Sequence, residues 1–124
     1  AIRGAATDGN AATAPDATWE PMLPTPPVHD YPSTHSALGN AAATVLAHVL
    51  GDTTPFAMTS LTANPAGSTR SFTRFSQAAK ENADSRVMAG LHFRFSCDAG
   101  LSLGENVGRW TVENHLKPTG YATK

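Results

Sequence analysis

The sequence has almost no cysteine, little net charge and no long hydrophobic run. Its 124 residues include one cysteine, Cys97, which excludes an intrachain disulfide. Without cysteine and histidine pairs at metal-ligand spacing, a structural zinc site is disfavoured. Nine basic and ten acidic residues give a net charge of −1, which argues against a nucleic-acid-binding surface. No run of about 18 apolar residues occurs, so the sequence predicts no membrane span.

Apolar residues recur at helical spacing over most of the chain after residue 32, which predicts an all-α fold of helical-bundle type. The clearest helix starts at Ser33, a candidate N-cap, and stops at Gly51. A short extended piece is expected at residues 56–59. The predicted helices cover residues 33–50, residues 71–95 with a bend or restart at 84–86, and residues 96–115.

The spacing also predicts which helix faces are buried. His35 lies three residues before Leu38 and seven before Ala42, so we expect these three side chains to share a buried face. His48 falls on the opposite side and is expected to face solvent without a role. The second helix should turn Phe72, Phe75, Ala79 and Ala83 inward and continue its apolar stripe through Val87, Met88, Leu91 and Phe95.

Three glycines recur every four residues in the last predicted helix, at Gly100, Gly104 and Gly108. Each costs roughly 1 kcal/mol of helix propensity relative to alanine. We attribute this cost to a second helix that packs very close to the glycine face. We expect that helix to come from another chain, so that the protein is a homo-oligomer or lies beside a separate N-terminal half.

Residues 1–32 form a proline-rich lead-in with little periodic apolar pattern. The prolines favour extended or polyproline-like backbone over residues 14–32. We expect this stretch to wrap over the helices through its large apolar side chains, Trp19, Met22, Leu23 and Val28. Residues 1–3 are interpreted as the tail of a helix that Gly4 stops.

The hexapeptide 31–36 (Tyr-Pro-Ser-Thr-His-Ser) stands where the lead-in stops and the first helix begins. Pro32 disfavours helix before it, and Ser33 can cap the helix that follows. His35 then lies in the first turn, where backbone N–H groups have no intrahelical partner. Free amides, a hydroxyl and an imidazole together suit an anion. The alternative is an ordinary helix start with a chance histidine.

Two motifs together resemble a known superfamily. The run 32–35 (Pro-Ser-Thr-His) is similar to the Pro-Ser-Gly-His element of the type 2 phosphatidic acid phosphatases and vanadium-dependent haloperoxidases. Ser85-Arg86, followed after five residues by His92, resembles the Ser-Arg-x5-His element of the same superfamily. The run 92–95 (His-Phe-Arg-Phe) resembles the soluble bacterial haloperoxidase branch. The implied fold is the all-α helical bundle of this superfamily.

The resemblance implies a set of site residues. His35 corresponds to the acid–base histidine. Ser33 and the backbone N–H of Thr34 correspond to oxyanion-binding groups, and Arg86 to the cationic clamp. His92 corresponds to the residue that binds vanadium in haloperoxidases or attacks phosphorus in phosphatases. Vanadate is the implied cofactor, with phosphate as a competing ligand.

The sequence departs from the family pattern in three ways. Thr34 replaces the usual glycine and crowds the anion. Ser96 stands where an aspartate usually orients the metal-binding histidine. The family's lysine followed after six residues by Arg-Pro is absent from the sequence. We therefore expect residues 1–124 to form the C-terminal part of one haloperoxidase- or phosphatase-like domain, with an extended part at 1–32 and a helical part at 33–124.

Two reactions follow from the resemblance. In a vanadium-dependent haloperoxidase, vanadate at His92 would bind hydrogen peroxide, His35 would manage its protons and a halide would be oxidised. In an acid phosphatase, His92 would attack a phosphate ester to form a phosphohistidine, and His35 would protonate the leaving group. The run 92–95 resembles the haloperoxidase branch, so it favours the haloperoxidase reaction over the phosphatase reaction. A non-catalytic assembly piece is the third hypothesis, and the resemblance favours a periplasmic or secreted location.

Overall fold

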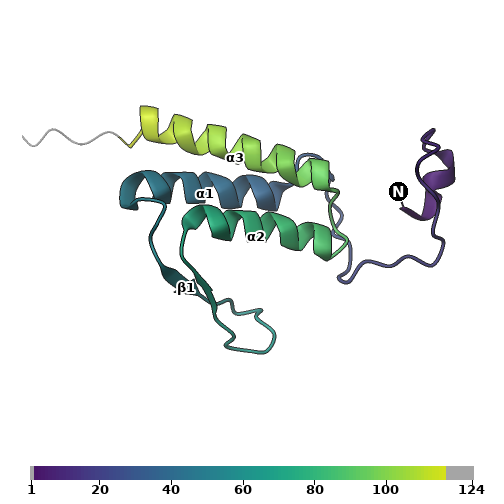
Figure 1. The fold of residues 1–124 in the computed structure, drawn as a ribbon, viewed down its shortest axis with the longest axis horizontal. Coiled ribbons are helices and arrows are strands. Elements are labelled where there is room, and N and C mark those ends of the chain that lie inside the picture. The colour runs from purple at the N-terminus through teal and green to yellow at the C-terminus, as the bar shows by residue number, and fades with distance from the viewer. Residues whose placement is uncertain (1, 117–124) are drawn as a thin grey trace, which may run out of the picture.

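Three helices lie side by side and form the body of the computed structural model, which describes residues 2–116 (Figure 1). The prediction of a mainly helical bundle is confirmed, with a small hairpin added to it. The elements are the 3-10 helix η1 (Ile2–Thr7), α1 (Thr34–Leu50), β1 (Phe56–Met58), β2 (Arg70–Phe72), α2 (Phe75–Met88) and α3 (Arg94–Asn114). No helix among the described residues is long and apolar enough to span a membrane.

Helices α1 and α3 pack through the glycine face of α3. A Cβ atom added at Gly100 would lie 2.5 Å from the carbonyl oxygen of Ser33, and one at Gly108 would lie 2.8 Å from that of Ala41. A Cβ at Gly104 would overlap the carbonyl oxygen of Ala37. The predicted close packing is therefore confirmed. The prediction that another chain covers this face is wrong, because α1 of the same chain occupies it.

Helix α1 turns its small residues toward the bundle and its large ones outward. Ser36 and Ala43 are its buried residues, while Leu38 remains 68% exposed. His35 and Ala42 are also exposed. The prediction that His35, Leu38 and Ala42 share a buried face is wrong, because a glycine-lined partner helix leaves room only for small side chains. His48 is exposed, as expected.

Helix α2 packs on α1 through Phe75, Ala79 and Ala83, which are buried as predicted. Phe72 is also buried, but it lies on β2, where it pairs with Phe56 across the antiparallel hairpin. The helix continues without a break through residues 84–86, so the predicted bend or restart is wrong.

The apolar stripe expected to follow Ala83 does not form. Helix α2 ends at Met88, and Gly90 has a φ of 73°, a left-handed conformation that suits glycine. The chain therefore changes direction before Leu91. Met88 is 76% exposed and Phe95 is 59% exposed.

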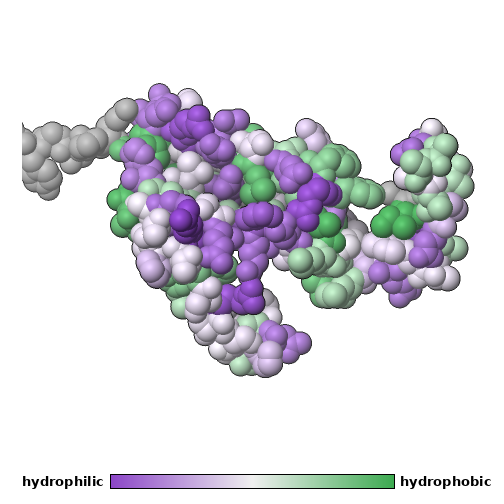
Figure 2. Space-filling model, viewed as in Figure 1, coloured by the Kyte–Doolittle hydropathy of each residue, from purple (hydrophilic) through white to green (hydrophobic). Residues whose placement is uncertain are grey.

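The lead-in contacts the bundle at several points, and two large side chains take part: Trp19, and Tyr31, whose ring stacks on that of Phe95. Trp19 packs on Gly90, where an added Cβ would lie 2.8 Å from its ring, and the N–H of Met22 donates to the carbonyl of Ala89 at 3.0 Å. The other predicted anchors, Met22, Leu23 and Val28, are largely exposed. Gly4 lies at a kink within η1 and does not end it. Apolar side chains reach the surface of both the bundle and the lead-in (Figure 2).

Candidate anion-binding site

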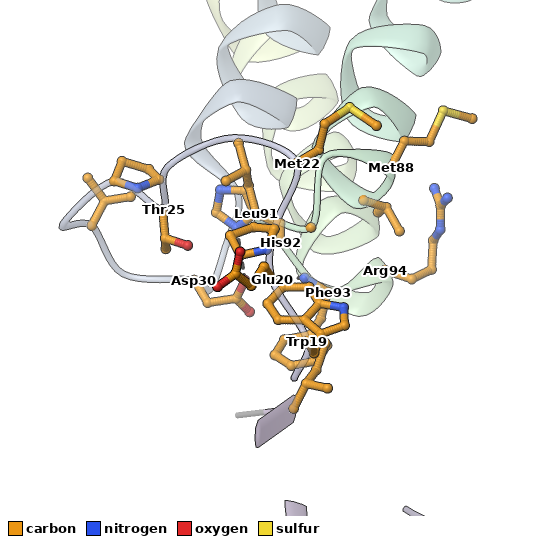
Figure 3. A pocket seen from close by; sticks show the side chains of 16 residues that line it. Trp19, Glu20, Met22, Thr25, Asp30, Met88, Leu91, His92, Phe93 and Arg94 are labelled. Carbon is orange, nitrogen blue, oxygen red and sulfur yellow. Dashed lines mark hydrogen bonds and ion pairs between the residues drawn. The ribbon is translucent and has the colours of Figure 1, made fainter. Parts of the chain in front are cut away.

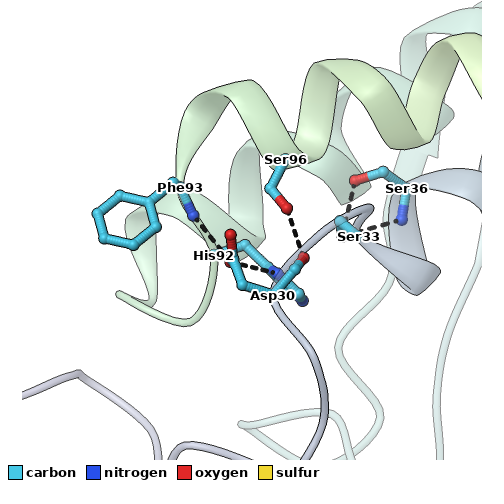
Figure 4. A network of polar contacts seen from close by, with 6 residues as sticks. All are labelled: Asp30, Ser33, Ser36, His92, Phe93 and Ser96. Carbon is cyan, nitrogen blue, oxygen red and sulfur yellow. Dashed lines mark hydrogen bonds and ion pairs between the residues drawn. The ribbon is translucent and has the colours of Figure 1, made fainter. Parts of the chain in front are cut away.

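The two sequence motifs meet where α1 begins and where the α2–α3 loop enters α3 (Figure 4). The N–H of Ser33 donates to the carbonyl of Ser96 at 3.0 Å. The hydroxyl of Ser96 donates in turn to the carbonyl of Asp30. Ser33 and Ser96 are both fully buried. This pair of bonds places the start of α1 beside the loop that carries His92.

Ser33 caps α1, as the sequence predicts. Its Oγ accepts hydrogen bonds from the N–H of Ser36 at 3.4 Å and from the Ser36 hydroxyl at 3.1 Å. Thr34 is the first helical residue, and its side chain is exposed. Within the described part of the chain, the N–H groups of Thr34 and His35 have no acceptor outside the helix. These two amides are free to bind an anion.

Arg86 lies in the last turn of α2, and its guanidinium is incompletely paired. Its Nε is buried and has no hydrogen-bond partner among residues 2–116. A buried guanidinium N–H without an acceptor costs free energy, so a bound anion would stabilise this arrangement. The backbone carbonyl of Arg86 accepts from the N–H groups of Leu91, at 3.0 Å, and His92, at 3.3 Å. A tight loop therefore joins the arginine to the histidine.

His35 belongs to the same electrostatic environment. Partial desolvation of this mostly exposed side chain lowers its pKa from the ordinary value of 6.5, and the nearby Arg86 and His92 lower it further. A neutral His35 beside a cation can accept a proton during a reaction and release it readily. His35 is therefore within electrostatic range of Arg86 and His92, which belong to the second sequence motif.

His92 is held by a carboxylate that the sequence analysis missed. Its ring is 2% exposed, and its Nδ1 lies 2.9 Å from Oδ1 of Asp30. The N–H of Phe93 donates to the same oxygen at 3.3 Å. In the family pattern this partner is an aspartate at position 96; in this chain Ser96 stands there and contacts the backbone of Asp30. The sequence signal that could have indicated this partner was the acidic residue two positions before Pro32.

A cavity of about 780 Å³ lies between residues 19–30 and residues 87–94 (Figure 3). Its walls are mostly apolar and include Trp19 and Phe93. Asp30 and His92 line it, but Ser33, Thr34, His35 and Arg86 do not. The cavity therefore meets the candidate site only at the Asp30–His92 pair. Among residues 2–116 there is no cluster of three His, Cys, Asp or Glu side chains that could hold a bare metal cation.

Comparison with known proteins supports the relationship suggested by the motifs. Residues 2–119 match the family model described as the VCPO second helical-bundle domain. No curated protein shows a significant match to this sequence.

Among the solved structures that match the fold are three of bacterial vanadium-dependent peroxidases. The crystal structure of the first bacterial vanadium-dependent iodoperoxidase has 39% sequence identity and a TM-score of 0.73, over 79% of this chain and 24% of that one. A holo-type bacterial vanadium-dependent chloroperoxidase has 21% identity and a TM-score of 0.63, over 78% and 23%. The apo-type structure has 20% identity and a TM-score of 0.62, with the same coverage. The chain thus spans about a quarter of the length of these proteins.

Proposed function

The chain belongs to the family of vanadium chloroperoxidase second helical-bundle domains, and we propose that it forms the vanadate-holding part of a vanadium-dependent haloperoxidase. The observation that carries the proposal is the buried, unpartnered Nε of Arg86, a residue whose backbone carbonyl is bonded to the N–H of His92. The bacterial vanadium-dependent iodoperoxidase that is 39% identical over 79% of this chain supports the same reaction class.

The donor set suits a tetrahedral oxyanion. Arg86 would neutralise part of its charge, and the free amide of Thr34 would bind one of its oxygens. The hydroxyl of Ser33 would donate a hydrogen bond to another oxygen of the anion. Its Oγ accepts two hydrogen bonds from Ser36, and its own O–H is left as a donor. Nε2 of His92 would bind the vanadium atom.

Bound vanadate would supply the activation of hydrogen peroxide toward a halide. The protein's own contribution would be to bind the oxyanion, orient it and move protons at His35. The lowered pKa of His35 suits this role, because the neutral imidazole can take a proton from a bound oxygen near neutral pH.

An acid phosphatase would use the same residues, since phosphate shares the shape and charge of vanadate. His92 would then attack phosphorus and His35 would protonate the leaving group. Residues 1–124 remain, as a proposal, the C-terminal part of one domain. Further cationic groups would come from outside this set, from a separate N-terminal half or from a second copy in a homo-oligomer.

Calorimetric titration of orthovanadate into the 124-residue chain tests the proposal. We expect saturable binding that Arg86→Gln weakens at least tenfold and that added phosphate competes away. Arg109→Gln serves as the matched control, because Arg109 pairs with Glu105 on the exposed surface of α3. Equal affinities for both variants would refute the proposed site. Halide oxidation and phosphate-ester hydrolysis, each with and without vanadate, then distinguish the two reactions.

A further inference from the structure

His92 is the one candidate site residue whose ring is nearly enclosed, and a single carboxylate faces its Nδ1 atom. The ring is 2% exposed and lies 2.9 Å from Oδ1 of Asp30. A second donor, the N–H of Phe93, reaches the same oxygen at 3.3 Å. Both residues come from irregular segments, 62 positions apart in the sequence, that meet at the bundle end (Figure 4).

Asp30 is held in place through its backbone. Ser96 is fully buried, and its hydroxyl donates to the carbonyl of Asp30. The carbonyl of Ser96 accepts the N–H of Ser33 at 3.0 Å, so both ends of segment 30–33 are tied to one residue of α3. These bonds fix the backbone of Asp30, and the N–H of Phe93 orients its side chain so that Oδ1 faces His92.

The hydrogen-bond chemistry of this pair determines which ring nitrogen carries the proton. An ionised carboxylate can only accept, so the nitrogen facing it must be the donor. Oδ1 of Asp30 already accepts the N–H of Phe93, which identifies this oxygen as an acceptor. The proton of the neutral imidazole therefore resides on Nδ1, and Nε2 retains its lone pair.

We propose that Asp30 is the positioning residue of His92: it fixes the Nδ1–H tautomer and the ring orientation, so that Nε2 is available as a ligand or nucleophile. The tautomer is inferred from the contacts of Oδ1 of Asp30 with His92 and Phe93, whereas its use in vanadate binding rests on the proposed function. Ser96 cannot supply the carboxylate itself, but it holds the residue that does.

Two substitutions separate the geometric from the electrostatic contribution. Asp30→Ala removes the acceptor and should release the ring to the Nε2–H tautomer. In Asp30→Asn, the N–H of Phe93 should select the amide oxygen for the Oδ1 position, which preserves the Nδ1–H tautomer while removing the charge. Asp98→Asn is the matched control, because Asp98 is an exposed carboxylate on α3.

Nitrogen-15 NMR of the histidine side chains in the 124-residue chain, at a pH where the rings are neutral, tests the inference. We expect the Nδ1–H form of His92 in the unaltered chain, in Asp30→Asn and in Asp98→Asn, and loss of this form in Asp30→Ala. An Nε2–H ring in the unaltered chain would overturn the proposal. So would an Nδ1–H ring in a folded Asp30→Ala variant. If Asp30→Ala does not fold, the spectrum of the unaltered chain still decides.

Orthovanadate affinity provides the second measurement. Loss of a hydrogen-bonding partner behind a ligating histidine typically costs 10–100-fold in affinity, which is the weakening we expect for Asp30→Ala. If no chain binds vanadate, the proposed function fails, but the NMR result still tests the tautomer. If Asp30→Ala binds as tightly as the unaltered chain, Asp30 has no positioning role.

Discussion

The backbone N–H of Ser33 donates to the carbonyl of Ser96 at 3.0 Å, and this bond joins the first residue before α1 to the first turn of α3. The serine that caps α1 is thereby held against the residue that also binds the backbone of Asp30. The position of the free amides of α1 relative to His92 depends on this junction. The candidate site is thus assembled by backbone bonds as much as by its side chains.

Gly104→Ala tests the helix packing on which this junction depends. An alanine Cβ would overlap the carbonyl oxygen of Ala37, which is backbone and cannot rotate away. We expect a net loss of about 1–3 kcal/mol in the free energy of unfolding, despite the better helix propensity of alanine. Urea denaturation measures the change. Gly4→Ala is the control, since nothing lies within 4 Å of its added Cβ.

Thr34→Pro isolates the contribution of one backbone amide. Proline is tolerated at the first helical position, and Ser33 before it is already extended, with φ −63° and ψ 114°. The substitution removes the N–H that we assign to an oxyanion. A hydrogen bond to a charged group contributes about 1.5–3 kcal/mol, so orthovanadate affinity should fall roughly tenfold or more.

Thr34→Ala is the companion variant, because it keeps the amide and removes only the β-branched side chain. Calorimetry should show near-normal affinity or tighter binding for it. Equal weakening in both variants would mean that the side chain, and not the amide, contacts the anion.

The protonation of His35 should respond to its cationic neighbours. Burial first, and then the charges of Arg86 and His92, lower its pKa below 6.5. Arg86→Gln should therefore move this pKa upward, whereas Arg109→Gln should leave it unchanged. Proton NMR of the His35 ring measures both. A midpoint at or above 6.5 in the unaltered chain contradicts the proposed arrangement.

The same shift has a defined sign for stability. The unfolded chain binds the His35 proton more tightly than the folded chain does, so acidification below pH 6.5 favours unfolding. The effect is absent above pH 6.5, where the residue is neutral in both states. His35→Gln should remove this part of the acid sensitivity, which urea denaturation at two pH values can detect.

Vanadate should bind the 124-residue chain weakly. The sequence lacks the family's lysine followed after six residues by Arg-Pro, so two cations are missing from the set around the anion. Removing one partner of a buried ionic cluster costs about 3–5 kcal/mol, which predicts affinity weaker by thousands-fold or more than in a relative that has both. Parallel calorimetry on the chain and on such a relative measures the difference. Comparable affinities would show that the two cations contribute little.

Sequence patterns predicted α1 and α3 well, but they extended the second helix beyond both ends of α2 and misjudged the buried face of α1. The glycine repeat at residues 100–108 correctly indicated a close partner helix. Each glycine lowers helix propensity, and close packing explains why three of them lie on one face. Periodicity around Leu38, in contrast, shows which residues share a face but not whether that face is covered. In this chain the small residues Ser36 and Ala43 are buried and Leu38 is not.

The motif residues were identified from sequence, but the carboxylate partner of His92 was not. His92 and Asp30 are 62 positions apart and both lie outside helices, so no periodic signal connects them. On one straight helix, the six-residue spacing would also turn Arg86 and His92 to different faces. In the structure the helix ends before His92, and the turn at Gly90, which has a positive φ, directs the chain back toward α2.

The outward-facing apolar side chains of α1 and α3 have a consequence for how the chain responds to temperature. Leu38, Val49 and Trp110 are 68%, 63% and 57% exposed in the folded state, so unfolding brings little additional area of these side chains into water. The heat-capacity change of unfolding should therefore fall below the usual value of about 12–15 cal/mol/K per residue. A small heat-capacity change flattens the dependence of stability on temperature, so cooling should neither strongly stabilise nor readily cold-denature the chain.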